Sequence, residues 1–81
     1  MSLKVLAFAG ARDAIGQPEL TLELDAPTTA RALLDRLCAE HARLAPFSSS
    51  LRLAINGAYA GWDDAIADGD EVAIIPPVAG G

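Results

Sequence analysis

Two prolines and two glycines in the closing segment "PPVAGG" have the types and spacing that best suggest chemistry. Pro76 and Pro77 fix φ near about −65° and favour an extended, polyproline-like path. Pro76 also lacks an amide hydrogen, so a strand that reaches it ends there. The two prolines are therefore expected to lead a short tail away from the folded body of the protein.

The tail that follows the prolines has almost no side-chain bulk. Val78 offers one modest apolar anchor, whereas Ala79, Gly80 and Gly81 present mainly backbone. Such a segment can enter a narrow channel of another protein, as an extended peptide adds to a sheet edge. The carbonyl carbon of Gly81 is unhindered, so we expect its carboxylate to be the reacting group. The alternative is an end without function, because chain termini are often small and disordered.

No other residues form a recognisable catalytic or metal-binding set. His41, the only histidine, is expected at the end of a helix, where a cation is mildly favoured. Cys38, the only cysteine, falls on the apolar side of that helix and is expected to pack as a small hydrophobic residue. Asp68 and Asp70 fit a tight turn better than a calcium-binding loop. We therefore predict no bound metal, no bound cofactor and no active site in the body of the domain.

The composition predicts one globular domain. Of the 81 residues, 52% are hydrophobic and 21% are charged. The net charge of −5 disfavours nucleic acid as a partner, since a phosphate backbone requires lysine and arginine. No apolar stretch approaches the ~20 residues that cross a bilayer, and the N-terminus lacks the apolar core of a signal peptide. We expect a cytoplasmic protein with no membrane partner and no internal disulfide.

The first half of the chain is expected to form two strands and a helix. Residues 19–25 alternate apolar with polar positions, as a half-buried strand does. Residues 3–9 carry apolar residues on both faces, which predicts a strand covered on one side and partly occluded on the other. Residues 10–18 between them contain the glycines and proline of a loop. A helix with Thr28 or Thr29 as its N-cap should follow, because apolar residues then recur at steps of three and four.

The second half is expected to return to the sheet. Residues 51–55 and 58–60 are predicted strands, joined by a tight turn at Asn56–Gly57 because both turn positions tolerate a positive φ. Residues 62–67 are expected to be an irregular connection. Residues 71–75 are nearly all apolar, which predicts a strand at the centre of the sheet.

The order of these elements predicts the fold class. Two strands, a crossing helix and a buried last strand describe an α+β roll of the β-grasp (ubiquitin-like) type, with a mixed sheet and one main helix. Residues 1–76 would form this domain, and residues 77–81 its extended tail ending in Gly-Gly.

Three motifs resemble those of the small subunits of molybdopterin synthase, the MoaD-type sulfur carriers. They are "FA.ARD..G" near the start, "INGAY" in the middle and "DGDEVAIIPPVAGG" at the end. The resemblance covers the whole chain and is strongest from Asn56 onward. Sulfur carriers of thiamine synthesis also end in two glycines on a β-grasp body, but they generally lack the two prolines and the "FA..RD" stretch.

This resemblance implies a sulfur carrier without an active site of its own. In the family, an adenylyltransferase similar to the ubiquitin-activating enzyme uses ATP to turn the terminal carboxylate, here that of Gly81, into an acyl-adenylate. Sulfur from a persulfide then displaces AMP and leaves a thiocarboxylate. The tail next enters the large subunit of the synthase, in a heterotetramer of two small and two large subunits, where the sulfur passes to the pterin precursor of molybdopterin.

The resemblance also implies a binding face beside the tail. Matched by position, its apolar contacts are Phe8, Tyr59 and Ile75, and Arg12 is a nearby polar contact. Ile75 stands where an aromatic residue is common, and Tyr59 stands where an aliphatic residue is common. We expect Phe8 to be partly exposed, because an apolar residue on an outer sheet face usually marks a binding surface.

Alternative functions use the same chain end. A ubiquitin-like modifier would be joined through Gly81 to lysines of target proteins, after the same activation. A sulfur carrier of another pathway, such as thiamine synthesis, would use the same thiocarboxylate. An interaction domain without acyl chemistry would tolerate removal of both glycines. The two prolines and the "FA.ARD" stretch favour the carrier of molybdopterin synthesis.

Overall fold

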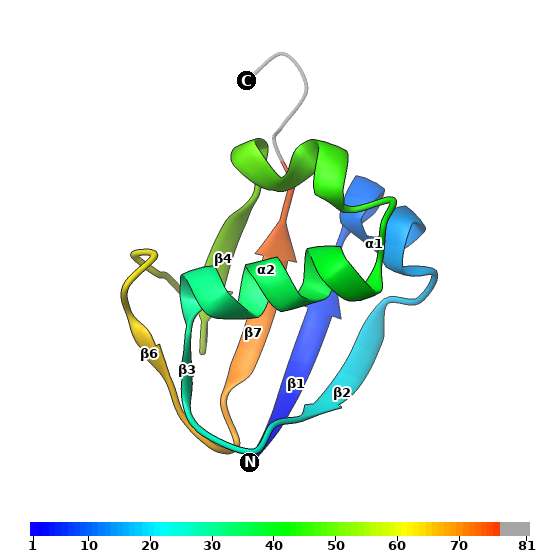
Figure 1. Cartoon of the computed structure of the whole chain (residues 1–81). Coiled ribbons are helices and arrows are strands. Elements are labelled where there is room, and N and C mark those ends of the chain that lie inside the picture. The colour runs from blue at the N-terminus through cyan, green and yellow to red at the C-terminus, as the bar shows by residue number, and fades with distance from the viewer. Residues whose placement is uncertain (77–81) are drawn as a thin grey trace.

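The computed structural model describes residues 1–76, and residues 77–81 lie outside the described part. Five strands form one mixed sheet in the order β2-β1-β7-β4-β5. Helix α2 (Ala30–Glu40) crosses one face of this sheet (Figure 1). The five strands are β1 (Ser2–Ala7), β2 (Glu19–Glu23), β4 (Arg52–Ile55), β5 (Ala58–Tyr59) and β7 (Glu71–Ile75). This is the α+β, β-grasp arrangement that the sequence predicts.

Strand β7 lies at the centre of the sheet, as predicted. It pairs in parallel with β1 and antiparallel with β4. Val72 and Ile74 are fully buried because they point toward α2, whereas Ala73 and Ile75 alternate to the opposite face and are half-buried. The last strand is therefore paired with a neighbouring strand along both of its edges and packed against α2 on one face. This fixes the position of Ile75, the residue at which β7 ends.

The expectation of a loop over residues 10–18 is wrong, because α1 (Ala9–Ile15) occupies most of it. Ala11 and Ile15 are one helical turn apart and both are buried in the core. Gly16 then ends the helix with a φ of 92°, a left-handed conformation that glycine adopts readily. The spacing of Ala11 and Ile15 was the only local sign of this helix, and the surrounding glycines obscured it.

Helix α2 begins where the sequence predicts. The Oγ1 atom of Thr29 accepts a hydrogen bond of 3.2 Å from the backbone N–H of Ala32, which is the expected N-cap. His41 is the C-cap, so its side chain lies near the helix end, as predicted. No helix within residues 1–76 has the length and apolar character needed to span a bilayer.

Short elements also appear where no helix or strand was predicted. One is a 3-10 helix, η1 (Ala45–Ser50). Within residues 62–67, β6 (Ala65–Ile66) pairs with β3 (Thr28–Thr29) as a separate two-stranded sheet. A two-residue strand is too short to show a period of two, so the sequence does not predict it. The strand β6 is stabilised by the complete burial of the Ile66 side chain in the core.

The predicted turn at Asn56–Gly57 is present, with φ values of 51° and 89°. It is tied to the turn before β7 through Asp70. The Asp70 carboxylate accepts a hydrogen bond of 2.9 Å from the Asn56 side-chain amide and one of 2.8 Å from the Ala67 backbone N–H. The Ala67 bond first, and the Asn56 bond second, lower the pKa of Asp70 from its usual value.

We expect Asp70→Ala to lower the melting temperature at neutral pH by about 2–5 °C. Because the folded-state pKa of Asp70 is depressed, its stabilisation is present above the unfolded-state pKa and is lost as the pH falls through the folded-state pKa. Thermal melts across the acid range should therefore show the gap between wild type and variant closing as the pH falls. Asp63→Ala, which removes the same charge from an exposed residue, is the control; an equal loss there would contradict the assignment.

Candidate functional site

The upper edge of the large sheet gathers residues from distant parts of the chain. β1 and β7 run in parallel and both end there, and Ala7 pairs with Ile74. β4 runs the other way and begins there, and Arg52 pairs with Ile75. β1 stops at Ala7, two residues earlier than predicted, and Phe8 leads directly into α1. The ends of β1 and β7 and the start of β4 therefore lie at one edge (Figure 1). Phe8, which follows β1, and Arg52, which begins β4, belong to this edge.

An apolar patch covers the upper half of the sheet face that points away from α2. The strand register aligns Leu6, Ala73, Ala54 and Tyr59 across four neighbouring strands. Phe8 continues the outward alternation of β1, and Ile75 does the same on β7. We call this surface the docking face; its members are Leu6, Phe8, Ala54, Tyr59, Ala73 and Ile75.

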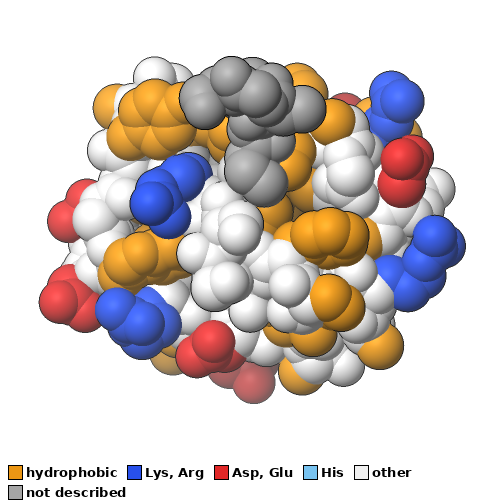
Figure 2. Space-filling view, turned by 90° about the horizontal axis from the view of Figure 1, so that it is seen from above, with side chains coloured by type: hydrophobic (Ala, Val, Ile, Leu, Met, Phe, Trp, Pro, Cys, Tyr) orange, Lys and Arg blue, Asp and Glu red, His pale blue; other side chains and the backbone are white. Residues whose placement is uncertain are grey.

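The docking face exposes large apolar side chains to solvent. Phe8 is 50% exposed, as expected from the sequence, and Tyr59 is 74% exposed. Figure 2, which looks down on the end of the molecule where β7 stops, shows hydrophobic side chains gathered there, with basic side chains on both sides. Aromatic residues exposed together on one surface mark an interaction site. The structure thus brings Phe8, Tyr59 and Ile75 to one face, while their role in binding stays a prediction.

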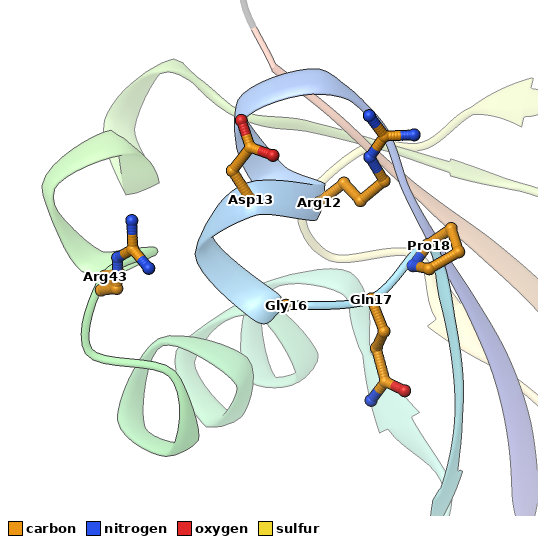
Figure 3. A pocket seen from close by; sticks show the side chains of 6 residues that line it. All are labelled: Arg12, Asp13, Gly16, Gln17, Pro18 and Arg43. Carbon is orange, nitrogen blue, oxygen red and sulfur yellow. The ribbon is translucent and has the colours of Figure 1, made fainter.

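Arg12 extends this surface from α1. It is exposed, and together with Phe8 and Leu6 it lines a shallow hollow of about 360 Å³ at the border of the docking face. On its other side a wider hollow of about 620 Å³ is lined by Arg12, Asp13 and Arg43 (Figure 3). Figure 3 shows Arg12 on one side of α1, and Arg43, which lies in the segment after α2, on the other side. Their two guanidinium groups do not converge on one point. This geometry suits contacts with a protein surface better than capture of a small ligand.

The described body of the protein carries no arrangement suited to nucleophilic or metal chemistry. Cys38 is partly buried, and burial together with the nearby Asp35 carboxylate raises the pKa of its thiol, which disfavours the reactive thiolate. Within residues 1–76, no three His, Cys, Asp or Glu side chains cluster as metal ligands.

Several predicted site residues lie at or beyond the limit of the described chain. Pro76 is described and follows β7 directly, with a half-buried side chain. The remaining predicted site residues fall outside the described residues; they are Pro77, Val78, Ala79, Gly80 and Gly81.

Sequence reasoning missed part of the site. Ala54, Ala73 and Arg52 belong to this surface only through the pairing of β4 with β7. A single sequence does not display that pairing, because it joins residues that are far apart in the chain, such as Ala54 with Ala73 and Arg52 with Ile75. Phe47 is 47% exposed as well, but it lies on η1 and is not a member of the docking face.

Comparison with known proteins places these features in a family context. Residues 5–81 match the ThiS family. The sequence is 41% identical over 83 residues to a molybdopterin synthase sulfur carrier subunit of Chlamydomonas reinhardtii, covering 100% of both chains. It is 38% identical over 81 residues to the subunit of the same name in Escherichia coli, covering 98% of this chain and 99% of the relative.

Solved structures of related chains share the fold. SAMP1 from Haloferax volcanii superposes with a TM-score of 0.84 at 28% identity, covering 100% of both chains. A chain from the complex of subunits 1 and 2 of the Helicobacter pylori molybdopterin-converting factor superposes with a TM-score of 0.68 at 21% identity, again over 100% of both chains. At that identity the Helicobacter pylori likeness shows the β-grasp fold alone.

Proposed function

This chain belongs to the ThiS family, and on that premise we propose that it is the sulfur carrier subunit of a molybdopterin synthase. The observation that carries the proposal is the position at which β7 ends. Ile75, the last residue of the strand, lies on the exposed docking face, and Pro76 follows it directly. The segment that closes in Gly80–Gly81 therefore starts beside the surface that a partner would cover.

In the proposed reaction, Gly81 supplies the reacting carbonyl carbon. An adenylyltransferase joins the Gly81 carboxylate to the α-phosphate of ATP and releases pyrophosphate. The terminal sulfur of a persulfide attacks the carbonyl carbon, and AMP leaves. A second thiol then cleaves the sulfur–sulfur bond, so that the sulfur stays on Gly81 as a thiocarboxylate. Adenylation is needed because a carboxylate is a poor acyl donor, whereas AMP is a good leaving group.

The proposed recipient is the large subunit of the synthase. The docking face would pack on that subunit while the tail enters its active site, because a segment with as little side-chain bulk as Ala79, Gly80 and Gly81 fits a narrow channel. The large subunit would supply the catalytic groups for transfer to the pterin precursor, in an assembly of two small and two large subunits. The relatives in Chlamydomonas reinhardtii and Escherichia coli, which are named as sulfur carrier subunits of molybdopterin synthase, support this pairing.

We expect protein isolated from cells that make the cofactor to include a form in which sulfur replaces one oxygen of the Gly81 carboxylate. Intact-mass spectrometry should detect this form by the mass difference between sulfur and oxygen. A variant that lacks Gly80–Gly81, expressed in the same cells, is the control and should show only its unmodified mass. Unmodified mass alone in the wild-type protein would contradict the proposal.

A protein modifier is the second candidate function. The likeness to SAMP1, a small archaeal modifier protein by the name given to its Methanosarcina acetivorans relative, favours it. A modifier would be activated in the same way, but its carbonyl would pass to a lysine amine and form an isopeptide bond. Denaturing gels of the same cells separate the two functions, since only a modifier forms covalent adducts of higher mass that depend on Gly81.

A further inference from the structure

Arg52 is a second cationic side chain, besides Arg12, at the border of the apolar docking face. Arg52 is the first residue of β4, and it pairs in register with Ile75. Residues directly opposite in an antiparallel pair place their side chains on the same face of the sheet. The next residue, Leu53, is 1% exposed and points into the core, so Arg52 points outward. Arg52 therefore lies beside the apolar side chain at which β7 ends.

The other basic residue on this sheet face, Lys4, is already paired with a carboxylate. Lys4 lies 3.0 Å from the Glu19 carboxylate, and the pKa of Lys4 is raised first by its hydrogen bond to Glu19, then by the Glu19 charge. Glu71, the residue of β7 that pairs with Lys4 of β1, also raises the pKa of Lys4, but by a smaller amount. These groups form a neighbouring cluster below the docking face. The positive charge of Lys4 is therefore balanced within the protein, without a partner.

Arg52 differs because no carboxylate within residues 1–76 forms an ion pair with it. Its only side-chain hydrogen bond in the described chain runs from Nη1 to the backbone carbonyl of Leu51, at 3.2 Å. Arg52 is exposed in the described part of the chain, so water can reach its guanidinium group. A partner that covers the docking face removes that water, and burying an unpaired charge is costly.

We propose that Arg52 is a specificity-determining residue, which requires a carboxylate on the surface of the large subunit that covers the docking face. This inference rests on the proposed function, since that function names the large subunit as the occupant of the face. A carboxylate is the group that best matches the planar fork of a guanidinium, through two parallel hydrogen bonds. A large-subunit surface that is equally apolar but lacks an acid would then be rejected.

The sign of the effect of Arg52→Leu tests this proposal. Leucine removes the charge and adds apolar area, so it should strengthen binding to a neutral apolar surface and weaken binding to a surface with a buried carboxylate. Titration of the purified large subunit into wild-type and Arg52→Leu protein should show a dissociation constant about 30-fold higher for the variant. Arg52→Lys, which keeps the charge but loses the paired hydrogen bonds, should fall between the two.

Arg31→Leu is the matched control, because it removes the same charge from an exposed residue of α2, which lies on the opposite side of the sheet from the docking face. It should change the dissociation constant by no more than about 2-fold, as expected of a screened surface charge. Equal melting temperatures would show that both variants are folded. If Arg52→Leu binds as tightly as the wild type or more tightly, the inference on Arg52 is overturned while the proposed function stands. If the wild-type protein does not bind the large subunit, the proposed function falls and the inference falls with it.

Discussion

Gly81→Val is expected to abolish sulfur transfer while the domain stays folded and able to dock. A branched Cβ next to the carbonyl carbon crowds the position that must accept nucleophilic attack. It also thickens a segment that we propose enters a narrow channel, and small misplacements of reacting groups cost about 100-fold in rate. We therefore expect molybdopterin formation to fall by about 100-fold or more, measured with reconstituted activating enzyme and large subunit.

The fold should tolerate this change, because the described core residues extend only from Leu3 to Ile74. Binding to the large subunit should persist at reduced strength, since the docking face is intact. Deletion of Gly80–Gly81 should give the same combination of a folded, docking and inactive protein. Pyrophosphate release by the activating enzyme separates a block at adenylation from a block at sulfur transfer. Near-wild-type molybdopterin formation by Gly81→Val would overturn the carrier mechanism.

The sequence predicts most of the fold because its local signals agree with the tertiary structure. The Asn56–Gly57 turn, the Thr29 cap and the apolar run that ends at Ile75 are each encoded by neighbouring residues. Helix α1 was missed because its core contacts, Ala11 and Ile15, are few and lie among residues typical of loops. In such a short segment, packing against the core overrides weak local preference.

The candidate site was predictable to a lesser degree, for a related physical reason. Phe8 and Tyr59 could be placed on an outer face from strand alternation and motif resemblance. Arg52 could not, because its position beside Ile75 depends on the register between two strands that are distant in sequence. A shift of that register by one residue would turn Arg52 to the other face. Charge placement on a binding surface is therefore a tertiary property, and the structure was needed to find it.

Phe8→Asp is expected to separate binding from stability more clearly than other changes on the docking face. Phe8 is the N-cap residue of α1, with φ −123° and ψ 151°, and its side chain makes no capping hydrogen bond. Aspartate is among the preferred N-cap residues and is worth about 1 kcal/mol there. The new cap should offset the loss of the packing of the half-exposed ring, so the melting temperature should stay near that of the wild type.

Binding to the large subunit should nonetheless weaken strongly in Phe8→Asp. The variant loses an aromatic anchor and places a carboxylate in an apolar contact, for which we expect roughly 2–4 kcal/mol, or about 30- to 1000-fold in the dissociation constant. Phe47→Asp is the matched control, because Phe47 is exposed to a similar degree but lies on η1, outside the sheet face. It should bind almost normally. Unfolding of Phe8→Asp would show that Phe8 belongs to the core, and equal losses in both variants would show that the partner does not recognise the docking face.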